Sequence, residues 1–392
     1  MPPRTLRLTE YRPREVRLRR TDVEALLADP YKAVEIVPTR ERGRYRLTAA
    51  GRVGVLLTPN LRVIIRPKIP AANLYLLLDP DAPPESTPDL AGVEPGTKAI
   101  DFLARRLADA MRARAATGLR RDYVERVGQQ PFLQGRLDVA AQARESPAAR
   151  DRFHVTRQEF SADSPFNRLP KATAEALVAS PFVSSGTRTY LRSVLAGYAG
   201  VSSTALDAAA FDAIAFDRLT EPERPIIDLC RLLARALRPS DASGELALPG
   251  FLLDLERVFE RYVERGLRTH LPATEIESQR EFRYHASVAA GQPTLAGRPD
   301  LVIRRGGKPA CAIDAKWKAL DGPPPAADVH QALAYALGLA CRDVRLVYPG
   351  RRSDAWRYEL SESDVILTVH TLRVVGPRER CERSVRRLAR AV

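Results

Sequence analysis

The segment GRPDLVIRRGGKPACAIDAKWKAL, residues 297–320, constrains the fold more than any other part of this sequence. Two runs of apolar and β-branched residues flank a Gly-Gly pair, which enters the left-handed turn of a tight hairpin at no steric cost. We therefore expect two antiparallel strands. Each run carries an aspartate, Asp300 or Asp314, and Lys316 lies two residues beyond the second, on the same face of its strand. Burying an unpaired charge costs several kcal/mol, so these side chains must be held by one another, by a metal ion or by a substrate.

The hairpin places Asp300 and Asp314 on neighbouring strands, where their carboxylates can converge on one point. Mg²⁺ sites commonly use one or two carboxylates, and Mn²⁺ accepts the same oxygen ligands. A divalent cation beside a lysine suits phosphodiester hydrolysis, because the cation neutralises the phosphate and activates water while the ammonium stabilises developing negative charge. The three side chains therefore predict a Mg²⁺-dependent nuclease site, with Mn²⁺ as a substitute.

A predicted helix precedes the hairpin, with the sequence LLDLERVFERYVERGLRTHL, and contributes a further acidic candidate. Glu260 shares a stripe with Val263 and Leu267, so it borders the apolar face and could reach over the sheet to the metal. The alternative is an ordinary charged surface, because glutamates and arginines surround Glu260 on this helix.

These residues match the motif of the PD-(D/E)xK nuclease superfamily. A Pro-Asp pair ends at Asp300, a gap of 13 residues follows, and an Asp-Ala-Lys run ends at Lys316. The next predicted helix carries Gln331 and Tyr335 in a Q-x-x-x-Y arrangement that resembles the RecB-like branch of the superfamily. Tyr335 and Gln331 also fit simple helix packing.

The resemblance implies roles for individual residues. The catalytic set that it implies is Asp300, Asp314, Lys316, Glu260 and Gln331. The implied metal ligands are Asp300, Asp314, Glu260 and the backbone carbonyl of Ala315.

Three regions follow one another along the chain, which predicts an α+β multidomain fold. Residues 1–97 are rich in branched residues between turn signals and are expected to be mostly β. Residues 98–245 are expected to be mainly helical, with a short strand-like interruption at QPFLQGRLDVAAQ. Residues 246–392 have the order αβββαβ with extra edge strands, the mixed sheet that the PD-(D/E)xK resemblance implies.

Two Pro-, Asp- and Ser-rich segments, 79–97 and 239–250, are the expected linkers between these regions. In the helical region, one apolar stripe marks the first helix: Ile100, Leu103, Leu107 and Met111. We expect the nuclease region near 246–392 to keep its fold when residues 1–97 are deleted.

The net charge of +14 is concentrated at the two ends of the chain. Residues 1–70 hold 16 Lys and Arg against 7 Asp and Glu, and residues 251–392 hold 24 against 18. A polyanion such as DNA would therefore meet these ends. Arginine enrichment from a GC-rich genome is the alternative explanation.

Several classes of protein are disfavoured by the sequence. No apolar run approaches the ~20 residues that span a bilayer, and no apolar stretch follows the basic N-terminus, so neither membrane insertion nor secretion is expected. The four cysteines are far apart and form no CxxC pair, which favours a reducing cytoplasm over a zinc or disulfide framework. The sequence has no GxxxxGK[ST] phosphate loop, so nucleotide hydrolysis would require a partner.

Beyond the nuclease motif, the sequence resembles the McrC family, the nuclease subunits of McrBC modification-dependent restriction systems. Three upstream stretches carry this resemblance: RVGVLLTPNLRVIIRPKIP (52–70), QPFLQGRLD (130–138) and EFSADSPFNRLPKA (159–172). FERYV, GRPDLVI, IDAKWK and DVHQALAYA follow in the same order.

This resemblance implies an endonuclease that cuts double-stranded DNA with modified cytosine and stimulates a hexameric AAA+ GTPase, McrB. Residues 1–97 would dock on that partner, and the sequence leaves open whether the partner uses GTP or ATP. Two alternatives remain: a stand-alone RecB-like repair nuclease, and a non-enzymatic activator of an AAA+ protein.

Overall fold

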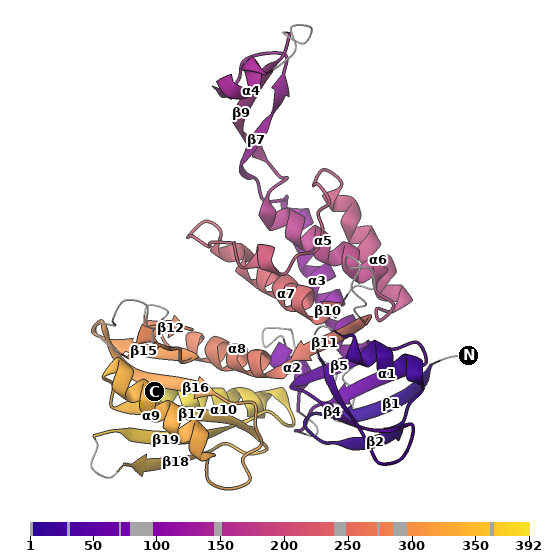
Figure 1. The fold of residues 1–392 in the computed structure, drawn as a ribbon. Helices are drawn as coiled ribbons and strands as arrows, with labels where there is room; N and C mark the ends of the chain where they lie inside the picture. Colours follow the sequence, from indigo (N-terminus) through magenta and orange to yellow (C-terminus); the bar gives the residue numbers. More distant parts are fainter. Residues whose placement is uncertain are drawn as a thin grey trace. The chain divides into compact units, whose positions relative to one another are not determined.

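The computed structural model divides the chain into two compact units, residues 1–99 with 240–392 and residues 100–239 (Figure 1). The first and third predicted regions thus share one unit. The three-domain boundaries themselves stay a prediction, and most of both predicted linkers lies outside the described residues. The structure describes residues 3–29, 32–69, 72–78, 97–144, 151–238, 248–272, 275–284, 296–360 and 364–392.

The N-terminal region of the first unit is rich in strands, as expected. Its strands are β1 (Arg4–Thr9), β2 (Arg14–Arg17), β3 (Val34–Pro38), β4 (Arg44–Ala49), β5 (Arg52–Leu57) and β6 (Leu61–Arg66). Two short helices accompany them, α1 (Arg20–Leu27) and α2 (Leu74–Leu78). Strands β2, β4 and β3 form one sheet, and β1, β6 and β5 belong to another, whose shared core includes Leu47, Leu56 and Ile65.

Strand β11 (Gly250–Asp254) joins the distant third region to this N-terminal sheet by pairing antiparallel with β5. The approach of the two strands is close: a Cβ on Gly54 would lie 1.9 Å from the carbonyl oxygen of Phe251. Glycine is therefore required at position 54, which lies within the 52–70 stretch. The shared sheet argues against the expectation that residues 246–392 fold without residues 1–97.

The helix predicted over 252–271 is shorter than expected, because its first residues belong to β11. Helix α8 runs from Leu255 to Arg268, and Asp254 caps it by accepting hydrogen bonds from the N–H groups of Glu256 and Arg257. The apolar run that begins this segment fits a buried strand as well as a buried helix, so periodicity alone placed the boundary wrongly.

The C-terminal region forms the expected mixed sheet, in the strand order β12-β15-β16-β17-β19-β18. Antiparallel β15 and β16 meet at Gly306 and Gly307, with φ of 57° and 79°, which confirms the predicted hairpin. Strands β16, β17 and β19 are parallel, and β18 is an antiparallel edge strand. The strands of this sheet are β12 (Ile276–Ser278), β15 (Leu301–Arg305), β16 (Lys308–Ala315), β17 (Asp343–Gly350), β18 (Asp354–Glu359) and β19 (Ile366–Arg373). Two short strands, β13 (Phe282–Arg283) and β14 (Ala296–Gly297), pair separately.

Helices cover both faces of this sheet. Helix α9 (Ala326–Leu339) packs on one face, in a core that includes Ala312 of β16 and Leu346 of β17. Helix α8 contacts β16, while α10 (Arg378–Ala391), a helix that the sequence patterns did not predict, contacts β19 and α8. The end of β16 therefore lies between helices α8 and α9.

The second unit contains the expected helices. Its helices are α3 (Thr97–Thr117), α4 (Val139–Ala143), α5 (Pro165–Ala179), α6 (Ser185–Leu195) and α7 (Arg224–Ala236), with 3-10 turns at Ala196–Tyr198, Ala209–Phe211 and Glu221–Glu223. The four residues of the predicted stripe on α3 are fully buried, as expected. A short strand, β10 (Leu237–Arg238), follows α7.

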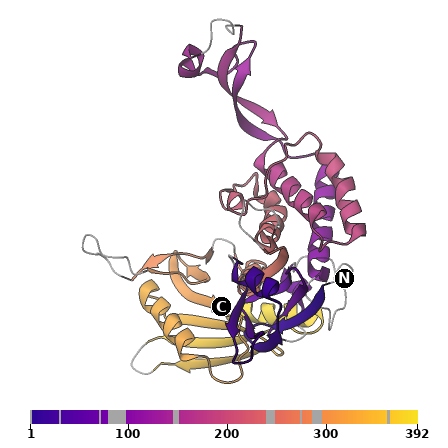
Figure 2. The same cartoon turned by 45° about the vertical axis from the view of Figure 1, so that its right-hand side comes forward.

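A long hairpin interrupts these helices, but the strand-like stretch predicted at 130–142 was wrong in large part, because it contains only the last residue of the first long strand, a two-residue strand and most of helix α4. Strands β7 (Asp122–Gln130) and β9 (Phe153–Ser161) pair antiparallel over nine residues, and β8 (Arg136–Leu137) joins β9. The hairpin extends away from the helices of its own unit in both views (Figures 1 and 2). Tyr123 and Val127 of β7 are each 71% exposed, so backbone pairing rather than a buried face defines this strand.

The SADSPFNR stretch, residues 161–168, holds the base of this hairpin through hydrogen bonds. The Asp163 carboxylate is buried and accepts hydrogen bonds from Arg126 of β7 (2.5 Å), Arg168 of α5 (2.7 and 2.9 Å) and Ser202 (2.9 and 2.8 Å). These bonds, above all that of Arg168, hold the pKa of Asp163 well below its usual range. The Asp163 carboxylate therefore links the hairpin to helix α5 and to the loop that contains Ser202.

The four cysteines are buried and free. Among the described residues, no helix is both long and apolar enough to cross a membrane.

Candidate functional site

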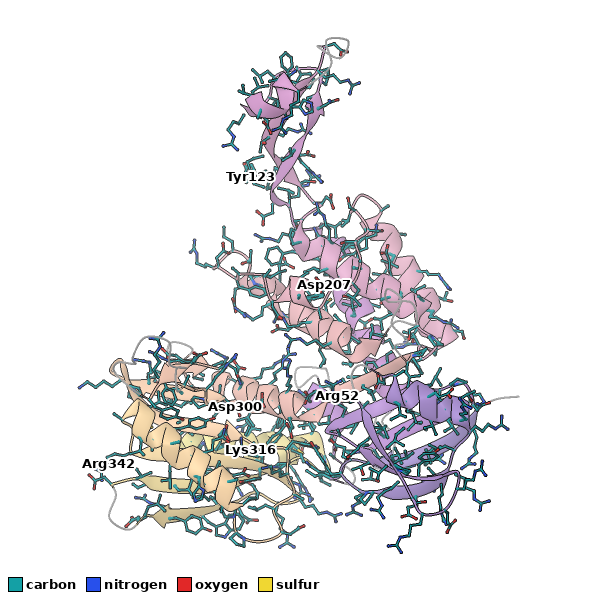
Figure 3. All side chains as sticks on the ribbon, viewed as in Figure 1. Arg52, Tyr123, Asp207, Asp300, Lys316 and Arg342 are labelled. Atoms are coloured by element: carbon teal, nitrogen blue, oxygen red, sulfur yellow. The ribbon has the colours of Figure 1, made fainter. Side chains whose placement is uncertain are left out.

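The hairpin brings the two predicted aspartates together. Leu301 pairs with Ile313, so Asp300, immediately before β15, lies across from Asp314 near the end of β16. The N–H of Ala315 donates a hydrogen bond of 2.8 Å to Asp300 Oδ2, which ties the first carboxylate to the strand that carries the second. Figure 3 labels Asp300 on this hairpin.

Lys316 and Gln331 complete this cluster. Lys316 Nζ lies 2.5 Å from Asp314 Oδ2 and donates a hydrogen bond of 2.9 Å to Gln331 Oε1 of α9 (Figure 3 labels Lys316). Gln331 Nε2 donates to the Tyr335 hydroxyl (2.8 Å), which donates to the carbonyl of Arg298 (3.2 Å). The Q-x-x-x-Y pair on α9 thus orients the lysine and also reaches the segment before Asp300.

Glu260 of α8 interacts electrostatically with the carboxylates of this cluster. Burial raises its pKa to about 7, and the negative charges of Asp300, Asp254 and Asp314 add to this shift. Asp300 responds in the same way, since burial and the charge of Asp314 raise its pKa to about 6. Carboxylates that disfavour one another's ionisation at neutral pH need a compensating positive charge.

Lys316 supplies part of that charge. Burial lowers the pKa of the lysine, but the charge and hydrogen bond of Asp314, together with the charges of Asp300 and Asp328, outweigh burial, so its pKa lies above the ordinary value. Burial raises the pKa of Asp314, and Lys316 offsets this only in part. Lys316 therefore offsets part of the negative charge that the cluster carries when its carboxyl groups ionise.

The donor set fits a hard divalent cation. Within the described ranges no three His, Cys, Asp or Glu side chains form a ready-made metal cluster. Mg²⁺ does not require one, because it commonly binds one or two carboxylates and fills its octahedron with waters and substrate phosphate oxygens. Asp300 and Asp314 meet this requirement, and the raised pKa values are those expected of metal-binding carboxylates without a cation.

Gln279 holds Asp300 and was not found by sequence patterns. Its backbone N–H donates to the Asp300 carbonyl (2.8 Å) and its Nε2 donates to Asp300 Oδ1 (2.9 Å). Gln279 has a φ of 51°, an uncommon conformation for a residue other than glycine. Neither this conformation nor the contact across 21 residues leaves a local signal in the sequence.

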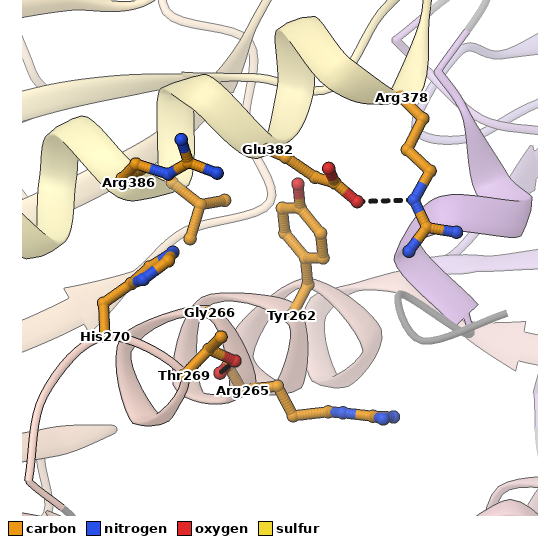
Figure 4. A pocket seen from close by; sticks show the side chains of 9 residues that line it. Tyr262, Arg265, Gly266, Thr269, His270, Arg378, Glu382 and Arg386 are labelled. Atoms are coloured by element: carbon orange, nitrogen blue, oxygen red, sulfur yellow. Dashed lines mark hydrogen bonds and ion pairs between the residues drawn. The ribbon is translucent and has the colours of Figure 1, made fainter. Parts of the chain in front are cut away.

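A surface cavity of about 270 Å³ lies between α8 and α10 (Figure 4). The two helices approach closely here, because a Cβ on Gly266 would lie 2.2 Å from Val385. Glu382 is ion-paired with Arg378 beside Tyr262. None of the predicted site residues lines this cavity.

The family of the chain is decided by a match over most of its length. Residues 47–349 match the family model described as "McrBC 5-methylcytosine restriction system component". The chain belongs to the McrBC family. This match confirms the resemblance expected from the upstream stretches, and no curated protein matches the chain.

Two solved structures of McrBC assemblies are similar to this McrBC-family chain. A refined half-complex from a tetradecameric assembly of Thermococcus gammatolerans McrB AAA+ hexamers with bound McrC matches with 19% identity and a TM-score of 0.54, covering 99% of this chain and 100% of that one. At this identity the match shows a shared fold. A cryo-EM structure of the Thermococcus gammatolerans McrBC complex matches with 21% identity and a TM-score of 0.41, covering 68% of this chain and 88% of that one.

Proposed function

We propose that this chain is the DNA endonuclease subunit of a McrBC-type restriction system and that its C-terminal region is a PD-(D/E)xK nuclease. The observation that carries the proposal is the convergence of Asp300, Asp314 and Lys316 at the end of one hairpin. The mixed sheet with helices on both faces supports the superfamily assignment.

In this proposal the catalytic groups act on a DNA phosphodiester. Asp300, Asp314, Glu260 and the carbonyl of Ala315 hold a divalent cation, Mg²⁺ or Mn²⁺, which supplies charge neutralisation and water activation. Lys316 donates to the phosphate oxygen on which negative charge develops. Gln331 keeps the ammonium in place through its 2.9 Å hydrogen bond, and Tyr335 keeps Gln331 in place.

The partner in this proposal is a McrB-like hexameric AAA+ GTPase, and the substrate is double-stranded DNA with modified cytosine. The family description names 5-methylcytosine restriction, and the similar structure holds McrC bound to McrB AAA+ hexamers. Residues 1–97 remain the proposed docking region.

Two measurements test the proposal. Asp300→Ala and Asp314→Ala should each lower cleavage of 5-methylcytosine plasmid ~10³-fold or more, since the cation contributes several kcal/mol to transition-state stabilisation. Lys308→Ala, on the exposed end of the same hairpin, is the matched control and should cleave normally. Full cleavage in excess EDTA would contradict metal dependence.

The partner is tested through its nucleotide hydrolysis. Adding this chain to the AAA+ protein should raise the rate with GTP or with ATP, whichever the partner uses. Asp300→Ala should leave that stimulation intact. An unchanged hydrolysis rate, together with cleavage by the chain alone, would favour a stand-alone nuclease. Stimulation without metal-dependent cleavage would favour a non-enzymatic activator.

A further inference from the structure

An aromatic pair adjoins two of the proposed site residues. Trp317 directly follows Lys316, is 1% exposed, and packs against Phe259 of α8 with ring centroids 5.7 Å apart. Phe259 directly precedes Glu260. The pair therefore fixes the segment that directly follows β16, and with it Lys316, against α8, which carries Glu260.

The N-terminal sheet reaches this pair through a buried carboxylate. Glu10 follows β1, and its backbone N–H donates to the Arg66 carbonyl at the end of β6 (3.0 Å). Its Oε2 accepts from the N–H of Lys68 (3.0 Å) and, in a longer contact of 3.4 Å, from the indole N–H of Trp317. A residue at one end of the chain thus contacts the neighbour of Lys316, 307 positions away.

The Glu10 carboxylate is poorly explained by stability alone. Glu10 is fully buried, and its Oε1 atom has no hydrogen-bond partner among the described residues. Burial raises the pKa of Glu10; the hydrogen bonds from Lys68 and Trp317 and the charge of Lys68 oppose this shift, and the charge of Glu256 adds to it. A buried carboxyl group with an unsatisfied oxygen adds little to stability compared with an apolar side chain of similar size. Besides the Lys68 N–H, the carboxyl group accepts from the indole N–H beside the proposed site.

We propose that Glu10 and Trp317 are positioning residues of the nuclease site: the N-terminal sheet holds Lys316 and Glu260 in place through them. This inference rests on the proposed nuclease function. Under this inference, residues 1–69 help to set the geometry of the site, in addition to any role in docking a partner.

The two tryptophans of the chain, Trp317 and Trp356, make the contact measurable. Trp356 lies on β18 and is 44% exposed, so Trp356→Phe is a mild change that leaves Trp317 as the sole tryptophan. In this full-length variant, Mg²⁺ should cause a saturable change in Trp317 fluorescence. The change should follow the Mg²⁺ binding measured by calorimetry and should disappear in Asp314→Ala.

Two conservative variants then test positioning. Trp317→Phe keeps an aromatic ring against Phe259 but removes the indole N–H, and Glu10→Met keeps a side chain of similar length but removes the oxygen that accepts from the indole. Both should lower kcat for methylated plasmid about 10- to 100-fold, with KM for DNA and melting temperature close to parental values, because misplaced groups mainly slow the chemical step. Trp356→Phe should keep the parental kcat.

The possible outcomes separate this inference from the proposed function. If the parental protein neither binds Mg²⁺ nor cleaves, the proposed nuclease function fails. Suppose instead that the parental protein binds Mg²⁺ and cleaves DNA. The positioning role is then overturned if Mg²⁺ leaves Trp317 fluorescence unchanged, or if both variants keep the parental kcat. If a variant loses its fold, the fluorescence response of the Trp356→Phe protein, in which Glu10 is intact, still decides.

Discussion

Lys316 is the cationic side chain that contacts both an acidic residue and α9 in the proposed site. An ammonium group cannot bind a cation, so Lys316→Ala should keep Mg²⁺ affinity within a few-fold while lowering kcat ~10²- to 10³-fold. Calorimetry and single-turnover cleavage measure the two quantities separately. Loss of Mg²⁺ binding in Lys316→Ala, with retention in Asp314→Ala, would reverse the assigned roles.

Glu260 makes the stability of the metal-free protein depend on pH. Burial raises its pKa from an ordinary value of 4.5 to about 7, so the folded protein holds a proton that the unfolded chain releases. The resulting stabilisation is complete below pH 4.5 and is lost as pH rises through about 7. Glu260→Gln cannot ionise and should therefore raise the free energy of unfolding at pH 8, by about 1–3 kcal/mol.

Urea unfolding in EDTA at pH 4.5 and pH 8 measures this effect, and the difference between Glu260→Gln and the parental protein should be small at the lower pH. Mg²⁺ should remove the advantage of the variant at pH 8, because the ionised carboxylate then has a partner. An equal difference at both pH values would show that Glu260 does not titrate as described.

At the scale of elements, the β7–β9 hairpin depends on its base because its strands bury little apolar surface. Asp163→Ala removes the acceptor shared by Arg126, Arg168 and Ser202 and should destabilise this unit by about 2–3 kcal/mol. Proteolysis within the hairpin should become faster, which limited digestion and mass spectrometry can follow. The control is Asp151→Ala, at an exposed position before β9; equal digestion of both variants would contradict the role of Asp163.

At the scale of the whole molecule, the two ends of the chain depend on one another. Deleting residues 1–97 removes β5, the partner of β11, and exposes Phe251, Leu252 and Leu253, each at most 3% exposed in the intact chain. The remaining protein should lose cooperative thermal unfolding and bind a hydrophobic dye. A cooperative transition in the truncated protein would restore the idea of an independent nuclease domain.

A point variant tests the same dependence in the full-length chain. Gly54→Ala should break the pairing of β5 with β11, because its Cβ would lie 1.9 Å from the Phe251 carbonyl oxygen. Gly128→Ala, whose Cβ would meet no atom within 4 Å, is the matched control. The melting temperature should fall by several degrees in the first variant alone.

Local patterns in the sequence determined much of this protein. The Gly-Gly turn fixed the β15–β16 hairpin and, with it, the meeting of Asp300 and Asp314, because both depend on residues close together in the chain. The stripe from Ile100 to Met111 likewise predicted α3, since helical periodicity is a local property. The stretches upstream of the nuclease motif pointed to the correct family.

Tertiary structure alone decided the contacts that join distant segments. The pairing of β11 with β5, the support of Asp300 by Gln279 and the contact of Glu10 with Trp317 connect residues that no periodicity relates. The length of the β7–β9 hairpin was hidden for a related reason, because an exposed strand lacks the alternating burial that marks most strands. Sequence patterns reveal which face of an element is buried, whereas the segment that covers it depends on how the whole chain packs.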